Sequence, residues 1–381
     1  MAGIVRKLNI AVLIKSFVKS GGSQRYAAEI ARRLVSRGHR IDLYTREVDE
    51  ELAAGMTICR VPEKLMYFGA VALYTFNRET ARLLTGKKYD IIHTHERGFI
   101  PCDIATQHSF SFRGSGYMAY SLHKKILQVY SSPLSWLHLW LEGGQMRAPH
   151  LVAVSRAIRE DTARYYGRAQ DVSVIPPGVD LDFFRPDQVI ARRQQARGAA
   201  SIGDHEIVVL FVGSEFKRKG LDLLIPAIGP GMRLVVVGRG ERLSYYRDLA
   251  ARHGVADRLI FAGLSDDVRQ YYAMADVLVL PSRSEAFGMS VLEAMACGLP
   301  VVTSVGAGVA DLIEHGVNGF LFRESGELGA VLKRAAELAS RQAIGERARQ
   351  TAEHYSWDRA ADAYEELMFQ LTAARRGEGR A

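Results

Sequence analysis

Short apolar runs alternate with amphipathic helical segments along the whole chain. The first half opens with an apolar run at Leu8–Lys15. A segment from about Ser23 to Arg37 follows, with apolar residues at helical spacing, and then a second run at Arg40–Thr45. Gly38 comes directly after the helical segment and suits the left-handed conformation that ends many helices. This order is typical of a strand–helix–strand unit.

Further apolar runs predict the other strands of two sheets. In the first half they are Thr57–Val61, Asp90–His95, Asp103–His108, Leu151–Ser155 and Ser173–Pro176. In the second half they are Ile207–Val212, Leu234–Val237, Leu259–Phe261, Val277–Leu280 and Pro300–Thr303, with helices beginning near Lys219, Arg242, Asp266, Gly288 and Val309. Nearly continuous apolar runs indicate parallel strands that helices cover on both faces. The predicted class is α/β, with two Rossmann-like doubly wound domains.

A proline pair marks the expected boundary between the domains. Pro176 and Pro177 lack the amide donor that a helix or ladder needs, and Gly178 follows them. We therefore expect one domain over 1–178 and a second over 179–355. Apolar and aromatic residues share one helical stripe near the C-terminus, which predicts a helix within 356–381 that completes the first domain.

Composition and charge narrow the setting. Of the 381 residues, 48% are hydrophobic and 24% charged, as in an ordinary globular protein. Three distant cysteines and the absence of a signal-peptide pattern or a membrane-spanning run predict a cytoplasmic protein. Residues 1–178 hold 25 Lys and Arg against 15 Asp and Glu, whereas the rest hold 25 against 27. Such asymmetry favours an anionic partner for the first half: nucleic acid, an anionic membrane or an acidic substrate.

Two glutamates flank the junction between a predicted strand and a helix. Glu285 precedes Phe287 and Gly288, which open the helix, and Glu293 lies inside it. Amides at a helix start, here those of Gly288, Met289 and Ser290, suit a pyrophosphate. The alternative is an ordinary loop carboxylate at 285 and a solvated helix residue at 293.

Two further loops follow predicted strands. The segment Val212–Asp222 reads VGSEFKRKGLD and holds Arg218 and Lys219 just before a glycine; by itself such a run is often a solvated basic turn. The segment Lys19–Arg25 holds Gly21 and Gly22, which allow close approach of the backbone to a ligand. The alternative there is a simple helix start with Ser23 as its N-cap.

Histidines end two predicted strands of the first half. His93, His95 and Glu96 form a His-x-His-Glu pattern, which could bind a metal, but no third ligand cluster has matching spacing. His108 ends the next strand, at the edge where parallel α/β sheets bind ligands. A buried structural histidine is the alternative.

The stretch Tyr117–Gln145 is rich in aromatic residues and leucine beside lysines. This composition suits a helix that lies in a membrane interface, or one that packs on the first domain. With the positive first half, we expect peripheral association with the inner face of the cytoplasmic membrane.

The spacing of Glu285 and Glu293 resembles the E-x7-E element of retaining glycosyltransferases, and the whole chain resembles glycosyltransferase family 4. Within it, the three loop motifs look most like enzymes that add a hexose to the lipopolysaccharide core. The resemblance implies a GT-B fold with domains facing across a cleft, and retaining transfer from UDP-glucose or a similar donor to a glycan or glycolipid acceptor. It implies no metal and no other cofactor. The first domain would hold the acceptor and the second the nucleotide.

The resemblance also implies roles for residues. Those with a catalytic role are His108, Glu285, Arg218 and Lys219, of which Arg218 and Lys219 hold the donor phosphates. Those that bind the donor are Gly21, Gly22, Ser214, Arg218, Lys219, Glu285, Phe287, Gly288, Met289, Ser290 and Glu293, with Glu293 on the ribose. Many family members have an arginine where this chain has Ser214.

Two other classes remain as alternatives. A UDP-sugar epimerase shares the architecture, although no second set of acid–base carboxylates is evident. A basic nucleic-acid-binding protein would fit a pI of about 9.3, although no basic stripe is interleaved with stacking aromatics.

Overall fold

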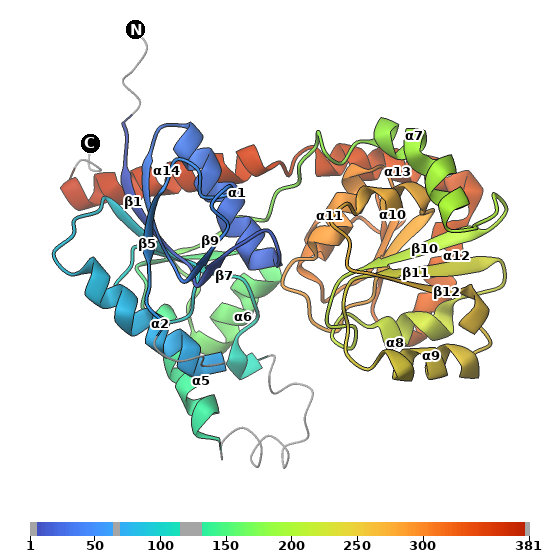
Figure 1. Cartoon of the computed structure of the whole chain (residues 1–381), viewed down its shortest axis with the longest axis horizontal. Coiled ribbons are helices and arrows are strands. Elements are labelled where there is room, and N and C mark those ends of the chain that lie inside the picture. Colours follow the sequence, from blue (N-terminus) through green and yellow to red (C-terminus); the bar gives the residue numbers. More distant parts are fainter. Residues whose placement is uncertain (1–5, 64–68, 115–131, 378–381) are drawn as a thin grey trace, which may run out of the picture. The chain divides into compact units, whose positions relative to one another are not determined.

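The computed structural model describes residues 6–63, 69–114 and 132–377. The chain divides into two compact units: an N-unit of Met1–Gly178 and Trp357–Ala381, and a C-unit of Val179–Ser356. Each has a parallel sheet with helices on both faces (Figure 1). The predicted α/β class with two Rossmann-like sheets is confirmed.

The sheet of the N-unit has seven strands, and all neighbours pair in parallel. The first strand lies inside the sheet; the next two strands of the sheet are added on one side of it and the remaining four on the other side, so the strand order reverses beside the first strand. In spatial order the strands are β5 (Thr57–Arg60), β3 (Arg40–Thr45), β1 (Asn9–Leu13), β6 (Ile91–Thr94), β7 (Ile104–Gln107), β8 (His150–Ala153) and β9 (Val172–Val174). Two short strands, β2 (Ser16–Phe17) and β4 (Glu47–Val48), pair separately.

Helices cover both faces of this sheet. In Figure 1, α1 (Gly22–Ser36) and α14 (Trp357–Arg376) lie along one face, and α2 (Gly69–Leu84) and α5 (Pro133–Gln145) along the other. The helix α6 (Arg156–Tyr166) joins β8 to β9. Arg37 ties α14 to the end of α1, because its guanidinium donates to Glu365 at 2.9 Å and also to Asp362. The C-terminal helix is therefore part of the N-unit.

Helix α1 ends as its sequence predicts. Gly38 has a φ of +88°, its amide donates to Val35 O at 2.8 Å, and the amide of His39 donates to Leu34 O at 3.1 Å. This pair of bonds is the Schellman motif, which satisfies the last carbonyls of the helix. The chain then enters β3 directly.

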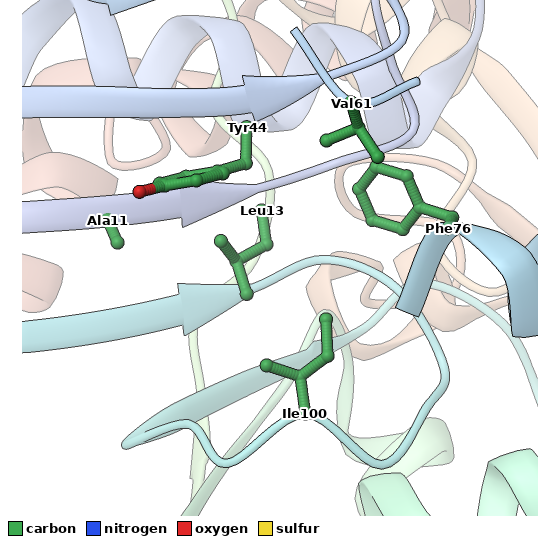
Figure 2. Close-up of a cluster of buried hydrophobic side chains, with 6 residues drawn as sticks. All are labelled: Ala11, Leu13, Tyr44, Val61, Phe76 and Ile100. Atoms are coloured by element: carbon green, nitrogen blue, oxygen red, sulfur yellow. The ribbon is translucent and has the colours of Figure 1, made fainter. Parts of the chain in front are cut away.

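Figure 2 shows a buried cluster that fixes α2 against the sheet. Phe76 of α2 meets side chains from β1 and β3 and from two loops. The members are Ala11, Leu13, Tyr44, Val61, Phe76 and Ile100. Burial of each large apolar side chain stabilises the fold by about 1.5–3 kcal/mol relative to exposure.

The sheet of the C-unit has six strands, again all parallel. In spatial order they are β12 (Leu259–Gly263), β11 (Met232–Val237), β10 (Ile207–Val212), β13 (Val277–Leu280), β14 (Val301–Ser304) and β15 (Phe320–Phe322). This is the dinucleotide-fold order, which reverses between β10 and β13.

Seven helices of the described chain belong to the C-unit. In Figure 1, α8 and α9 cover one face and α10 and α11 the other, where α7 packs on α10 and α13 on α11. Their bounds are α7 Pro186–Ala199, α8 Leu221–Leu224, α9 Leu243–Arg252, α10 Arg269–Met274, α11 Met289–Ala296, α12 Leu328–Ala336 and α13 Leu338–Ala352.

Local predictions fail where short elements depend on tertiary partners. The helix expected from Val309 is only a 3-10 turn, Gly308–Leu312. The amides of Gly308 and Val309 donate to the carbonyls of Glu285 and Phe287, so this segment pairs with the motif loop and does not extend into a helix. The three-residue strand β15 was not predicted, because so short a run carries no clear periodicity.

Candidate active site

The loops that carry the sequence motifs of the C-unit meet where its strand order reverses. Residues 213–220 follow β10, and residues 281–288 follow the adjacent strand β13. In open α/β sheets, ligands bind outside the carboxyl ends of the strands at this switch point. Both motifs therefore lie where the fold places its ligands.

Two glycines bring the basic loop close to the end of β13. Gly220 has a φ of +79°, and a Cβ added there would lie 2.0 Å from the carbonyl oxygen of Pro281. A Cβ at Gly213 would lie 2.4 Å from Cδ of Lys219, so the aliphatic part of the Lys219 side chain packs directly against the Gly213 backbone. Without these glycines Lys219 could not occupy this position.

Lys219 and Arg218 share one carboxylate. Lys219 Nζ donates to Glu285 Oε2 at 2.8 Å, and Arg218 Nη1 lies 3.4 Å from the same oxygen and donates to Ser284 O at 2.6 Å. The side chains of Lys219 and Glu285 are only 14% and 12% exposed. Partial burial strengthens such a pair relative to one at the open surface. Ser214, on the same loop, is exposed.

Helix α11 begins at Met289, shortly after Glu285 in the sequence. Gly288 has a φ of +107°, and a Cβ there would lie 3.2 Å from Val309 Cγ1, so glycine suits the turn into the helix. Phe287 is buried, and its carbonyl accepts the Val309 amide at 2.7 Å. Met289 and Ser290 form the first turn, whose amides have no intrahelical partner. The Ser290 hydroxyl is buried with no hydrogen-bond partner among the described residues.

Glu293 is a buried residue. Its side chain lies on α11, and Tyr272 of α10 donates to Glu293 Oε2 at 2.8 Å. The alternative of a solvated helix residue is therefore wrong. Tyr272 itself is fully buried, and no motif had indicated it as a partner.

In the N-unit, the glycine loop also leads into a helix. Gly21 has a φ of +95°, and a Cβ there would lie 2.2 Å from Gln24 Oε1. Helix α1 begins at Gly22, so Ser23 lies inside its first turn and is not the N-cap. The N-cap is Gly21, without a side-chain hydrogen bond.

Three histidines gather at the carboxyl ends of β6 and β7. His95 Nδ1 lies 2.9 Å from His108 Nε2, and the rings of His93 and His95 are 4.2 Å apart. Burial lowers the pKa of His108 to about 3, and burial with the nearby His108 lowers the pKa of His93 to about 3. Burial also lowers the pKa of His95, with smaller effects from His93 and His108. All three rings are therefore neutral at neutral pH.

Hydroxyl groups connect this cluster to distant parts of the N-unit. His93 Nε2 lies 2.8 Å from Thr106 Oγ1, which lies 2.7 Å from the Tyr364 hydroxyl of α14. Tyr26 of α1 bonds both Tyr364 and the carbonyl of Ile175. In the sequence both tyrosines lie among apolar residues at helical spacing, and such periodicity gives no signal for hydroxyl contacts.

A pocket of about 330 Å³ opens beside the histidines. Its polar lining includes Lys15, Glu96, Arg97, His108, Ser109 and Gln145. Arg97 donates to Ser109 Oγ at 2.8 Å and pairs with the buried Glu142 at 3.3 Å. Burial raises the pKa of Glu96, although a hydrogen bond from the Lys15 amide at 2.9 Å opposes this shift. A concave site with several charged and hydroxyl groups suits a polyhydroxylated ligand.

Other expectations concern metals and membranes. Within residues 6–63, 69–114 and 132–377, no three His, Cys, Asp or Glu side chains converge as metal ligands. No helix in these same ranges has the length and apolar character that crossing a bilayer requires. Of the stretch Tyr117–Gln145, residues 117–131 lie outside the described residues, and the rest is largely helix α5.

Two family models together match most of the chain. The model of glycosyltransferase family 4 matches residues 20–183, and the model of glycosyl transferases group 1 matches residues 192–354. The first lies in the half with the histidine pocket, and the second contains both C-unit motif loops.

Curated relatives agree with these models. The chain is 31% identical to a D-inositol 3-phosphate glycosyltransferase of Geodermatophilus obscurus, covering 93% of this chain and 85% of the relative. It is 29% identical to a GDP-mannose-dependent alpha-(1-6)-phosphatidylinositol monomannoside mannosyltransferase of Mycobacterium tuberculosis, covering 80% and 82%.

Solved structures share the fold. WaaG, a glycosyltransferase involved in lipopolysaccharide biosynthesis, superposes with a TM-score of 0.81 at 22% identity, covering 94% of this chain and 99% of WaaG. Anabaena Alr3699/HepE in complex with UDP and glucose gives 0.73 at 22% identity, covering 95% and 99%. With these folds and relatives, the chain belongs to the group 1, family 4 glycosyltransferases of GT-B fold and is an enzyme that transfers a glycosyl group from a nucleotide-sugar.

Proposed function

We propose that the C-unit binds the diphosphate of the nucleotide-sugar at the start of α11. The observation that carries this proposal is the meeting of Lys219, Arg218 and Glu285 beside that helix start, at the switch point of the sheet. Helix amides and two cations would neutralise the diphosphate. Glu293, already oriented by Tyr272, would accept hydrogen bonds from the ribose hydroxyls.

The same groups would stabilise the leaving nucleotide. Negative charge grows on the diphosphate as the bond to the sugar breaks, and preorganised donors that face this charge lower the barrier. Arg218, Lys219 and the amides of Met289 and Ser290 would supply positive charge that a divalent cation supplies in other enzymes. We therefore propose a reaction that requires no metal.

Transfer would proceed with retention of configuration. The departing phosphate oxygen would take the proton of the acceptor hydroxyl, so no side chain acts as a nucleophile. Glu285 would orient the donor sugar, and His108 would contact the hexose. Gly21 and Gly22 would let the backbone of the N-unit approach the donor phosphates.

For the donor sugar we propose a hexose, with UDP-glucose as the first candidate. The structure of Alr3699/HepE contains UDP and glucose, whereas the mycobacterial relative is named as GDP-mannose-dependent. At 22% identity the first comparison shows the fold alone, so both nucleotides belong in the test.

For the acceptor we propose a polyhydroxylated molecule with an anionic group, bound in the histidine pocket. Lys15 and Arg97 line that pocket, and basic residues outnumber acidic residues within residues 1–178. The relative from Geodermatophilus obscurus is named for inositol 3-phosphate, and WaaG for lipopolysaccharide biosynthesis. Inositol phosphate and phosphorylated lipopolysaccharide core are the two acceptors to compare.

A panel of UDP- and GDP-sugars tests the proposed donor site. A ligand that binds only the native state raises the free energy of unfolding by RT ln(1 + [L]/Kd), and the melting temperature rises as a result. We expect one nucleotide-sugar to stabilise the chain and to be consumed in the presence of acceptor and EDTA, with retained anomeric configuration. Isomerised nucleotide-sugar without transfer would favour an epimerase, and loss of transfer in EDTA would contradict the metal-free proposal.

We also propose that α5 contacts an anionic membrane surface, on the inner face of the cytoplasmic membrane. Leu134 and Trp136 are each 54% exposed, and α5 carries no lysine or arginine. Its one carboxylate, Glu142, is buried. Apolar and aromatic side chains next to a positive domain suit a membrane interface.

The double variant Leu134→Ser, Trp136→Ser should reduce binding to vesicles that contain phosphatidylglycerol by about 10-fold, because two apolar contacts are lost. Cosedimentation with the vesicles measures the fraction of protein that binds. Ile190→Ser is the control, since Ile190 is 72% exposed on α7 of the C-unit. Equal binding by the native chain and the double variant would contradict the proposed contact.

A further inference from the structure

Every guanidinium nitrogen of Arg218 has a partner in this structure, and two of the four side-chain hydrogen bonds go to one residue. Glu215 Oε2 accepts from Arg218 Nε at 2.8 Å and from Nη2 at 2.6 Å. The remaining nitrogen, Nη1, contacts Ser284 O and Glu285 Oε2. The Nε–Nη2 edge of the guanidinium therefore already holds a carboxylate.

That edge is one that a guanidinium uses to bind oxyanions with two parallel bonds. A phosphate oxygen pair and the carboxylate of Glu215 cannot occupy it together. For Arg218 to bind a diphosphate through this edge, Glu215 must leave first.

The backbone of Glu215 places its side chain in this position at a conformational cost. Glu215 has a φ of +57°, in the left-handed region where glycine or asparagine is more easily accommodated. Its side chain is 66% exposed, so the carboxylate can move into solvent without desolvation. The bond to Arg218 is thus formed by a residue that is both strained and free to depart.

Lys219 differs in this respect. Its partner Glu285 is 12% exposed and lies on the motif loop, with its backbone carbonyl bonded to Gly308. The Glu285 side chain is therefore largely buried, whereas the Glu215 side chain lies mostly in solvent.

From this contrast we propose that Glu215 is an internal competitor of the donor: its carboxylate occupies the Arg218 edge in the free enzyme, and the diphosphate of the nucleotide displaces it. The inference rests on the proposed donor site. Its consequence is weaker nucleotide binding, since each binding event must break the Glu215–Arg218 pair. An exposed pair of this kind contributes up to about 1 kcal/mol, which corresponds to roughly 3- to 5-fold in Kd.

Calorimetric titration with UDP and GDP tests the proposal. Glu215→Gln should tighten binding of the preferred nucleotide about 3-fold, a direction that structural damage does not produce. Glu215→Gly, which also removes the strained side chain, should tighten it similarly. In an Arg218→Gln background, Glu215→Gln should have no effect, because the two residues form one coupled pair.

Glu241→Gln separates this effect from a general loss of negative charge. Glu241 is exposed in the loop after β11, at the same edge of the sheet, and has no hydrogen bond to Arg218 among the described residues. We expect it to leave the nucleotide Kd unchanged. An equal gain in Glu241→Gln, or a persisting gain without Arg218, would overturn the proposal.

The failures of the two proposals are distinguishable. If the native chain binds UDP or GDP and Glu215→Gln binds it equally or more weakly, the competitor is disproved while the donor site stands. If the native chain binds neither, the donor site is disproved and the competitor with it.

Discussion

Replacement of Lys219 by alanine is expected to lower kcat/KM for the nucleotide-sugar by about 100- to 1000-fold, the scale seen when one preorganised charge-stabilising donor is removed. Lys219 Nζ bonds Glu285 at 2.8 Å beside the start of α11, and its stem is positioned by Gly213. The variant removes a cation from the proposed diphosphate site and leaves Glu285 without its closest partner. Initial rates at limiting donor measure the loss.

Lys217→Ala is the matched control. Lys217 belongs to the same basic run, but its side chain is 69% exposed and its amine pairs with Asp222 and not with Glu285. We expect this variant to keep kcat/KM within about 3-fold of the native value, because its ion pair involves none of the proposed donor ligands. If both lysine variants have the same activity, the run is only a solvated basic turn and the assignment of Lys219 is wrong.

His108→Ala is expected to lower kcat by about 100-fold while the Kd of the nucleotide stays unchanged. The side chains proposed to bind the nucleotide, those of Arg218, Lys219 and Glu293, lie in the C-unit, whereas His108 lines the pocket of the N-unit. Because burial lowers its pKa to about 3, His108 stays neutral from pH 5 to 8. The native kcat should therefore show no inflection near pH 6.5 from this ring. Saturation kinetics and calorimetry measure the two effects.

His150→Ala provides the comparison. His150 begins β8, at the opposite edge of the same sheet, and bonds Ser173 at 2.9 Å. It should leave kcat within about 2-fold of the native value. Lost nucleotide binding in His108→Ala, with turnover at saturation preserved, would mean that its role is misassigned.

Much of the fold follows from local sequence. The strands β3, β10 and β13 occupy the predicted residues, because a run of buried β-branched and aliphatic side chains is a strong signal. The Schellman end at Gly38 was also predictable from one residue type. Short elements such as the five-residue turn Gly308–Leu312 depend on hydrogen bonds from their amides to the carbonyls of a neighbouring loop.

The candidate site was predictable in part. Residue types and spacing drew attention to Glu285, Glu293, Arg218 and Lys219, because strand ends and helix starts are visible in the sequence. Partners from other elements were not visible: Tyr272 reaches Glu293 from a different helix, and Tyr364 reaches Thr106 across 258 residues. Glu215 was part of a noted motif, but residue propensity indicates neither its bond to Arg218 nor its positive φ.

A crystal structure of the chain soaked with UDP or GDP would show where the diphosphate binds. We expect diphosphate oxygens within hydrogen-bond distance of the Met289 and Ser290 amides and of Lys219 Nζ, with Glu293 on the ribose. A diphosphate bound away from the start of α11, with Lys219 still bonded only to Glu285, would contradict this expectation.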